Sequence, residues 1–293
     1  MPALLARLRA LRTLLLGELP APTSPAGPGL AWWVVLTFGA VFFVELTHDL
    51  KGDPLLRGAW RGSLFGAVPL AAGMLWALRG RARGLAAIGA LLVCVPTVMR
   101  LMGPPKASLL AQAPTPAFAA LGLGLALVLA AARWGGEPLA RWGLATGDWR
   151  WWLPRTAAAA VLIVIGATAA MHLSAEMREF YPWYRPARHH ADQLLRQQVG
   201  LALDFIGWEY LFRGFLLFAL ARRGDVVAAI LFQAAVFFLL HKGKPDVELF
   251  LSLPGGILAG WFCWRAGSFL PLWVLHTVQI VSVNLLGFWL RNG

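Results

Sequence analysis

The residue types best suited to chemistry lie near the C-terminal end of the chain, inside apolar runs. Glu209 and Arg213 stand four residues apart in DFIGWEYLFRGFLLF, residues 204–218, with the acid first. At this spacing two side chains share one face of a helix, and this order favours an ion pair. A charged side chain at the centre of a membrane helix costs about 2.5–3.5 kcal/mol on insertion scales. The pair is therefore either a structural ion pair or part of a reaction site, whereas Asp204 is expected on another face, at a water-accessible end.

Two histidines extend this set. His241 ends the run ILFQAAVFFLLH, and His276 lies in LPLWVLHTVQIVSVNLLGFW. A single histidine in an apolar helix is more often a hydrogen-bonding residue between helices. Two histidines and an acid in one dry cavity, however, are the groups needed to polarise a water and to stabilise the oxyanion that its attack creates. A His-His-Glu set also suits zinc, an alternative that ranks lower because the sequence has no HExxH spacing.

These residues require a scaffold of membrane helices. Of the 293 residues, 59% are hydrophobic and 14% are charged, which is too apolar for a soluble domain of this length. A helix of about 20 apolar residues crosses a bilayer because it satisfies its own backbone hydrogen bonds. The sequence therefore predicts an all-α, polytopic membrane bundle of about eight or nine transmembrane helices. The predicted spans are 29–47, 61–78, 84–102, 115–132, 155–173, 196–220, 226–241, 247–264 and 267–289.

The predicted domain organisation is simple. Residues 1–28 form an amphipathic segment with leucines at helical spacing, followed by a linker rich in proline and glycine. Residues 29–293 form a single transmembrane domain with the candidate active site in 194–290. The loop 174–196 contains Tyr181, Trp183 and Tyr184, which are expected in an aromatic belt at the membrane interface, with a substrate gate as the alternative.

The charge of the chain excludes one class of partner. The formal net charge is +12, but the basic residues are scattered among short loops and form no stripe with interleaved aromatic residues, so nucleic acid is not an expected partner. The expected partners are the lipid bilayer and a protein or peptide substrate at the membrane. The basic residues are mostly arginine, and the chain is rich in alanine, glycine and proline. This composition indicates a GC-rich bacterial genome and hence a bacterial inner (plasma) membrane.

The order of the motifs resembles a known family. Glu-x-x-x-Arg-Gly at 209–214, then Phe-x-x-x-His at 237–241, then a histidine in a later span is similar to the CAAX-protease and bacteriocin-processing family of intramembrane endopeptidases. The resemblance covers about 194–290. Two positions depart from the family pattern. Trp208 stands where the family has the first of two glutamates, and Ile280 stands where it commonly has asparagine or another polar residue.

The resemblance implies peptide-bond hydrolysis without a covalent intermediate and without a cofactor. Glu209 and His241 would activate the attacking water, with Glu209 taking the part of the family's first glutamate. Arg213 would orient Glu209. Zinc remains the alternative chemistry for the same histidines.

The implied oxyanion site contains His276 and an amide. Gln279 lies three residues after His276 and can share its helical face, and Asn284 is a more distant candidate. Each amide is otherwise expected to hydrogen-bond a neighbouring helix.

The substrate class follows from the family alone. Its members process prenylated tails, peptide pheromones or bacteriocins, and its myxosortase branch is thought to cleave sorting signals of surface proteins. The resemblance therefore implies an intramembrane endopeptidase that matures or sorts bacterial surface proteins. The alternative is a non-catalytic membrane scaffold or immunity protein of the same family that binds a partner. A transporter ranks last because the two halves show no matching pair of broken helices.

Overall fold

The computed structural model describes residues 5–7, 10, 13, 28–47, 54–101, 114–222 and 225–293. Within these ranges the chain is helical and contains no β-strand, which confirms the predicted all-α membrane bundle. The predicted N-terminal amphipathic segment and linker lie almost entirely outside the described residues.

The long helices follow the predicted spans closely. Among the described residues, three helices, α7, α12 and α13, are long and apolar enough to cross a membrane by length and composition; the total of eight or nine spans stays a prediction. Short helices α8 (Ala175–Phe180), η1 (Leu139–Trp142) and η2 (Arg185–Arg188) connect the longer ones. The long segments are α2 (Pro28–Thr47), α3 (Pro54–Ala77), α4 (Gly80–Leu101), α6 (Pro114–Gly135), α7 (Trp149–Leu173), the continuous run α9 (Ala191–Glu209), η3 (Tyr210–Leu216) and α10 (Leu217–Ala221), then α11 (Val226–Leu239), α12 (Asp246–Ala266) and α13 (Leu270–Asn292).

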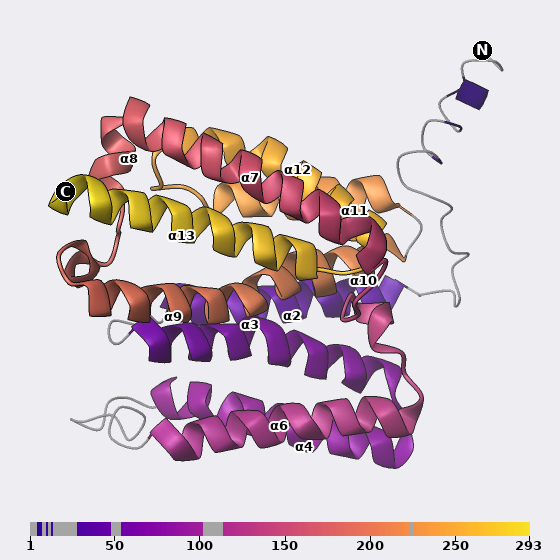
Figure 1. Ribbon diagram of the computed structural model, residues 1–293. Helices are drawn as coiled ribbons and strands as arrows, with labels where there is room; N and C mark the ends of the chain where they lie inside the picture. Colours follow the sequence, from indigo (N-terminus) through magenta and orange to yellow (C-terminus); the bar gives the residue numbers. More distant parts are fainter. Residues whose placement is uncertain are drawn as a thin grey trace.

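The helices run side by side in layers (Figure 1). Helices α4 and α6 pair at one side of the bundle, and α3 packs between α4 and α9. Helix α13 then joins α9 to α7, while α11 and α12 form a hairpin on the same side as α7. Helix α7 and all helices from α9 onward therefore form one group. Helix α3 packs against the α9 side of this group.

The outer faces of the bundle are apolar. Leu162 and Leu173 on α7 are 69% and 86% exposed, and Phe250 on α12 is 69% exposed. Single exposed leucines are ordinary in soluble proteins, but contiguous apolar faces on helices of membrane-spanning length indicate contact with lipid. Fold and sequence thus agree on an integral membrane protein.

Small residues let α3 and α9 approach closely. Gly58 and Gly62 of α3 face Gly200 and Gly207 of α9. A Cβ atom added at Gly58 would lie 1.7 Å from the Gly200 carbonyl oxygen, and one added at Gly207 would lie 2.3 Å from that of Gly62. Small residues at such spacing are the usual means of close helix packing in membranes. This contact fixes α9, the helix that ends at Glu209.

A buried ion pair joins the same two helices. The carboxylate of Asp204 lies 2.9 Å from Nη1 of Arg61 on α3, and Asp204 is buried. The expectation that Asp204 sits at a water-accessible end is therefore wrong. Its face of α9 meets α3, where Arg61 supplies the counter-charge that makes burial tolerable.

The predicted span 196–220 is helical, but it is not α-helical throughout. Its middle part, η3, is a π-helix that carries Arg213, and π-helical turns are rare and frequent at functional sites. A loop glycine in the left-handed region, Gly143 (φ 74°), packs on this segment. A Cβ atom there would lie 2.7 Å from Cα of Gly214, so only glycine permits the contact.

The α11–α12 hairpin is held by a buried amide. Nε2 of Gln233 donates to the carbonyl oxygen of Gly256 at 2.7 Å, and a Cβ atom at Gly256 would lie 3.2 Å from Cα of Ala234. Helix α11 ends at Leu239, so His241 lies in the turn rather than at the predicted helix end. The turn brings His241 beside the first turn of α12.

Candidate active site

Glu209, Arg213 and His276 form one buried cluster. Nη1 of Arg213 lies 3.2 Å from each carboxylate oxygen of Glu209, and Nδ1 of His276 lies 2.6 Å from Oε1. Glu209 and Arg213 are each 1% exposed. The guanidinium carbon of Arg213 also lies 3.9 Å from the centroid of the Phe237 ring, a cation–π contact. The ion pair expected from the spacing is present, and α13 adds a histidine to it.

The His276 imidazole is fixed in orientation. Its ring stacks on Phe205 with centroids 3.9 Å apart and an interplanar angle of 17°. Because the Glu209 carboxylate accepts at Nδ1, this nitrogen carries a hydrogen. Nε2 is then the nitrogen left for a ligand.

The His241 imidazole is fixed by a different acceptor. Its Nδ1 lies 2.7 Å from the carbonyl oxygen of Phe237, one turn earlier. A carbonyl only accepts, so Nδ1 carries the hydrogen and Nε2 of the neutral ring has a free lone pair. This Nε2 lies 4.0 Å from Oε1 of Glu248 on α12.

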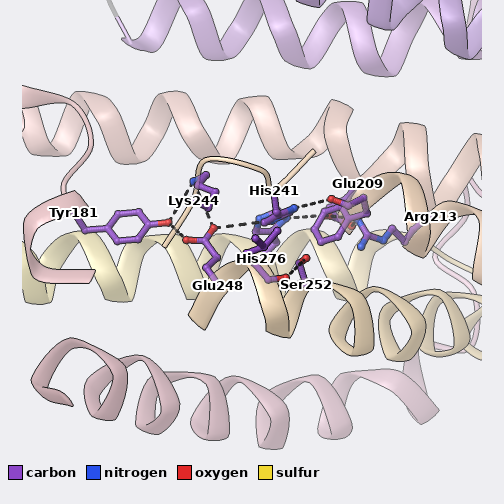
Figure 2. Close-up of polar contacts among 10 residues, drawn as sticks. Tyr181, Glu209, Arg213, His241, Lys244, Glu248, Ser252 and His276 are labelled. Carbon is purple, nitrogen blue, oxygen red and sulfur yellow. Dashed lines mark hydrogen bonds and ion pairs between the residues drawn. The ribbon is translucent and has the colours of Figure 1, made fainter. Parts of the chain in front are cut away.

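Both imidazoles line one cavity of about 560 Å³. Most of its wall is apolar and comes from α7, α12 and α13, which is typical of a small-molecule or peptide site with few oriented polar groups. Figure 2 shows the imidazoles between Glu209 and Arg213 on one side and Glu248 and Tyr181 on the other. The polar side chains on the wall are those of Tyr181, Glu209, Arg213, His241, Glu248, Ser252, His276 and Gln279.

The two predicted oxyanion amides have different surroundings. Gln279 lines the cavity on the same helix as His276. Asn284 is buried and donates from Nδ2 to Oε1 of Gln198 on α9 at 3.4 Å, and it is not among the described residues that line the cavity. Of the two amides, Gln279 is therefore the one on the cavity wall.

The two positions that depart from the family pattern are not among the described residues that line the cavity. The Trp208 ring lies 5.5 Å from that of Phe65 and 5.1 Å from that of Phe212, within an aromatic cluster between α9 and α3. Ile280 is buried in an apolar cluster with Met171 of α7. Trp208 and Ile280 thus contribute packing at their positions.

Sequence reasoning missed Glu248 and misplaced Tyr181. The Tyr181 hydroxyl donates to Oε2 of Glu248, and Nζ of Lys244 lies 3.4 Å from Oε1. Tyr181 is buried rather than in an interface belt. Burial and the Glu248 charge raise the pKa of the Tyr181 phenol, so its hydroxyl keeps the proton that it donates. The available signal was an acid seven residues after His241, at the start of an apolar run.

No group of three or more His, Cys, Asp or Glu side chains within the described ranges is arranged to hold a metal ion. The expectation that the site works without a cofactor stays a prediction.

Fold and site together define a helical membrane protein whose apolar cavity holds two oriented imidazoles and two carboxylates. Residues 190–280 match the family model described as type II CAAX prenyl endopeptidase Rce1-like. This match confirms the resemblance to the CAAX-protease and bacteriocin-processing family, and it spans Glu209, Arg213, His241 and His276. It supports a membrane peptidase of the CAAX type. Searches of curated proteins and of solved structures each found no match.

Proposed function

We propose that this protein is an intramembrane endopeptidase that hydrolyses a peptide bond of a protein or peptide substrate at the membrane. One observation carries the proposal: His241 and His276 line the same apolar cavity, and each has its Nδ1 committed to a fixed acceptor. Each ring therefore has Nε2 left for the reaction. One imidazole can serve as base and the other as oxyanion donor.

The reaction proceeds by direct attack of water. Nε2 of His241 takes a proton from the water as its oxygen bonds to the scissile carbonyl carbon, and the carbonyl π electrons move to the carbonyl oxygen. His276 and the Gln279 amide stabilise this oxyanion. When the intermediate collapses, the C–N bond breaks and the leaving nitrogen takes the proton from His241. One water is consumed, and one carboxyl and one amino end are formed.

Glu209 and Arg213 position His276, the proposed oxyanion donor. The expected partnership of Glu209 with His241 is replaced in this proposal, because Glu209 contacts His276 at 2.6 Å. In this proposal His276 carries both ring hydrogens: Nδ1–H donates to Glu209, and Nε2–H donates to the oxyanion. Arg213 orients Glu209 from the other side, as expected, and balances its charge in a buried setting.

The substrate is a segment that lies at the membrane and presents apolar side chains to the cavity wall. Maturation or sorting of bacterial surface proteins fits this requirement, and the bacterial inner membrane is the proposed location. The competing possibility is a scaffold or immunity protein that uses the same helices to bind a partner.

The test compares source cells that express wild type, Glu209→Gln, His241→Ala or His276→Ala at matched levels. Mass spectrometry of membrane, surface and secreted proteins identifies any precursor that accumulates in the variants. We expect all three variants to accumulate the same uncleaved precursor, because each removes one part of the site. Unchanged cleavage in well-expressed variants would overturn the protease proposal in favour of partner binding, which the near-isosteric Glu209→Gln change should leave intact.

A further inference from the structure

We propose that Glu248 is a catalytic residue, the carboxylate that holds the attacking water together with His241. This inference rests on the proposed function and names a residue that the family motifs leave out. It also identifies a second acid for a chain that has Trp208 where the family has its first glutamate.

The first argument is the separation between the two groups. Oε1 of Glu248 and Nε2 of His241 are 4.0 Å apart, which is too long for a direct hydrogen bond. The spacing suits one water bonded to both atoms, and such bridging is nearly as favourable as direct contact. Both side chains line the cavity, so a water between them has access to a bound peptide.

The second argument is that both atoms accept. Nδ1 of His241 carries the ring hydrogen because it faces the Phe237 carbonyl, so Nε2 offers a lone pair. The Glu248 carboxylate also offers lone pairs. A water that donates both hydrogens to these two acceptors turns its own lone pairs outward, the orientation needed to attack a carbonyl carbon.

The third argument is that Glu248 is held in place. The Tyr181 hydroxyl donates to Oε2, while Lys244 Nζ lies 3.4 Å from Oε1 and supplies a counter-charge. Tyr181 is itself fixed by α13, where a Cβ atom at Gly287 would lie 2.6 Å from the Tyr181 carbonyl oxygen. These contacts leave Oε1 directed toward His241, as Figure 2 shows.

Glu209 is the less suitable acid for this task. Its Oε1 already receives hydrogen bonds from Arg213 and from His276, and Arg213 also lies 3.2 Å from Oε2. Arg213 and His276 thus hold Glu209 beside His276, whereas Oε1 of Glu248 faces Nε2 of His241 at 4.0 Å, the spacing that one bridging water fills. The two acids therefore pair with different histidines. Glu209 pairs with His276, the proposed oxyanion donor, and Glu248 pairs with His241, the proposed base.

In the reaction, Glu248 takes no proton in the net balance. The water donates one hydrogen bond to Oε1 of Glu248 and gives its other proton to Nε2 of His241 as the new C–O bond forms. The imidazolium then lies close to the Glu248 carboxylate, which stabilises its charge. The proton passes to the leaving nitrogen when the C–N bond breaks, and both side chains return to their starting states.

The test uses purified protein in liposomes of source-cell lipids and, as substrate, the precursor that accumulates with His276→Ala. The variants are Glu248→Gln, Glu248→Asp and Glu248→Ala. The matched control is Asp246→Asn, which removes an exposed acid from the same first turn of α12. Thermal unfolding of each variant is measured alongside kcat and KM.

We expect Glu248→Gln to lower kcat by about 10²–10⁴-fold, the usual contribution of acid–base groups, with KM and unfolding temperature nearly unchanged. Glu248→Asp should keep part of the activity, and Asp246→Asn should keep all of it. Added formate should restore turnover in Glu248→Ala, because it returns a carboxylate to the vacated space, but not in His276→Ala.

Two results would overturn the inference while leaving the proposed function intact. One is near wild-type kcat in Glu248→Gln when His241→Ala and His276→Ala are inactive. The other is a loss of kcat that follows a loss of thermal stability and does not respond to formate, which would make Glu248 a structural residue. If the histidine variants also cleave normally, the proposed function itself fails.

Discussion

At the scale of single residues, the two imidazoles of the cavity differ in the atom that each Nδ1 contacts, and the proposed roles rest on this difference. His241 is backed by the neutral carbonyl of Phe237, whereas His276 is backed by the charged carboxylate of Glu209. A carbonyl oxygen only accepts, so it fixes the His241 tautomer with the Nε2 lone pair available, which suits the proposed base. The Glu209 carboxylate orients the His276 ring through Nδ1, which suits the proposed donor to an oxyanion. The proposed roles of the two histidines thus follow from the acceptor that each Nδ1 contacts.

The substitution Trp208→Glu tests whether an acid at position 208 can serve the site. Restoring the family's acid with Trp208→Glu should not raise the cleavage rate, because the side chain at 208 lies among the rings of Phe65 and Phe212 and not on the cavity wall. It should also destabilise the fold. Trp208 is half-buried, so loss of its ring costs part of the ~3–5 kcal/mol that a fully buried aromatic side chain is worth in soluble cores, and a carboxylate in its place adds a cost of desolvation. The measurements are turnover of the same precursor and thermal unfolding in detergent.

The matched variant is Trp208→Phe, which keeps an aromatic ring in the cluster and should retain most of the activity and stability. A faster rate in Trp208→Glu than in wild type would contradict the geometry, since it would place the effective acid on α9.

At the scale of elements, α9, the helix that ends at Glu209, is held by a helix outside the matched region 190–280. Helix α3 contacts α9 through facing glycines and through the ion pair of Arg61 with Asp204 at 2.9 Å. The pair lies on the α3 side of α9, while Glu209 lies on the cavity side. Breaking it should therefore act on stability first and on turnover only through the position of α9.

The change Arg61→Met should lower the free energy of unfolding by about 3–5 kcal/mol, the usual cost of leaving one buried partner uncompensated. The double variant Arg61→Met with Asp204→Leu should recover a large part of this loss, because it removes the orphaned charge. Unfolding can be followed through labelling of the buried Cys263 thiol in a Cys94→Ala background. If the double variant is as unstable as Arg61→Met, the uncompensated charge of Asp204 is not the cause of the lost stability.

Local contacts were predictable from sequence, and contacts between distant elements were not. The Glu209–Arg213 pair follows from helical spacing alone. The partner of Asp204 lies on α3, and the contact of Glu248 with His241 depends on the turn between α11 and α12, so neither is encoded in a periodic pattern. The π-helical segment that carries Arg213 likewise follows from tertiary packing, since its sequence is compatible with an ordinary α-helix.

At the scale of the whole molecule, the cavity lies where α7, α12 and α13 meet, and the outer faces of α7 and α12 are the apolar faces of the bundle. Ile163 lines the cavity, while its neighbour Leu162 is 69% exposed. Helix α7 thus presents one face to the cavity and another to the outside of the bundle. This arrangement suits a substrate that resides in the membrane, because its apolar segment and the cavity wall share one environment.

The assignment of that outer face to lipid predicts the effect of one charge on α7. Leu162→Asp should reduce the amount of protein that resists carbonate extraction from membranes, because an acid near the centre of a span costs about 2.5–3.5 kcal/mol on insertion scales. Leu162→Ala removes the same side chain without a charge and should insert normally. If the Leu162→Asp protein accumulates in membranes at the wild-type level and remains active, the exposed face of α7 does not contact lipid. The cavity would then be reached from water rather than from the bilayer.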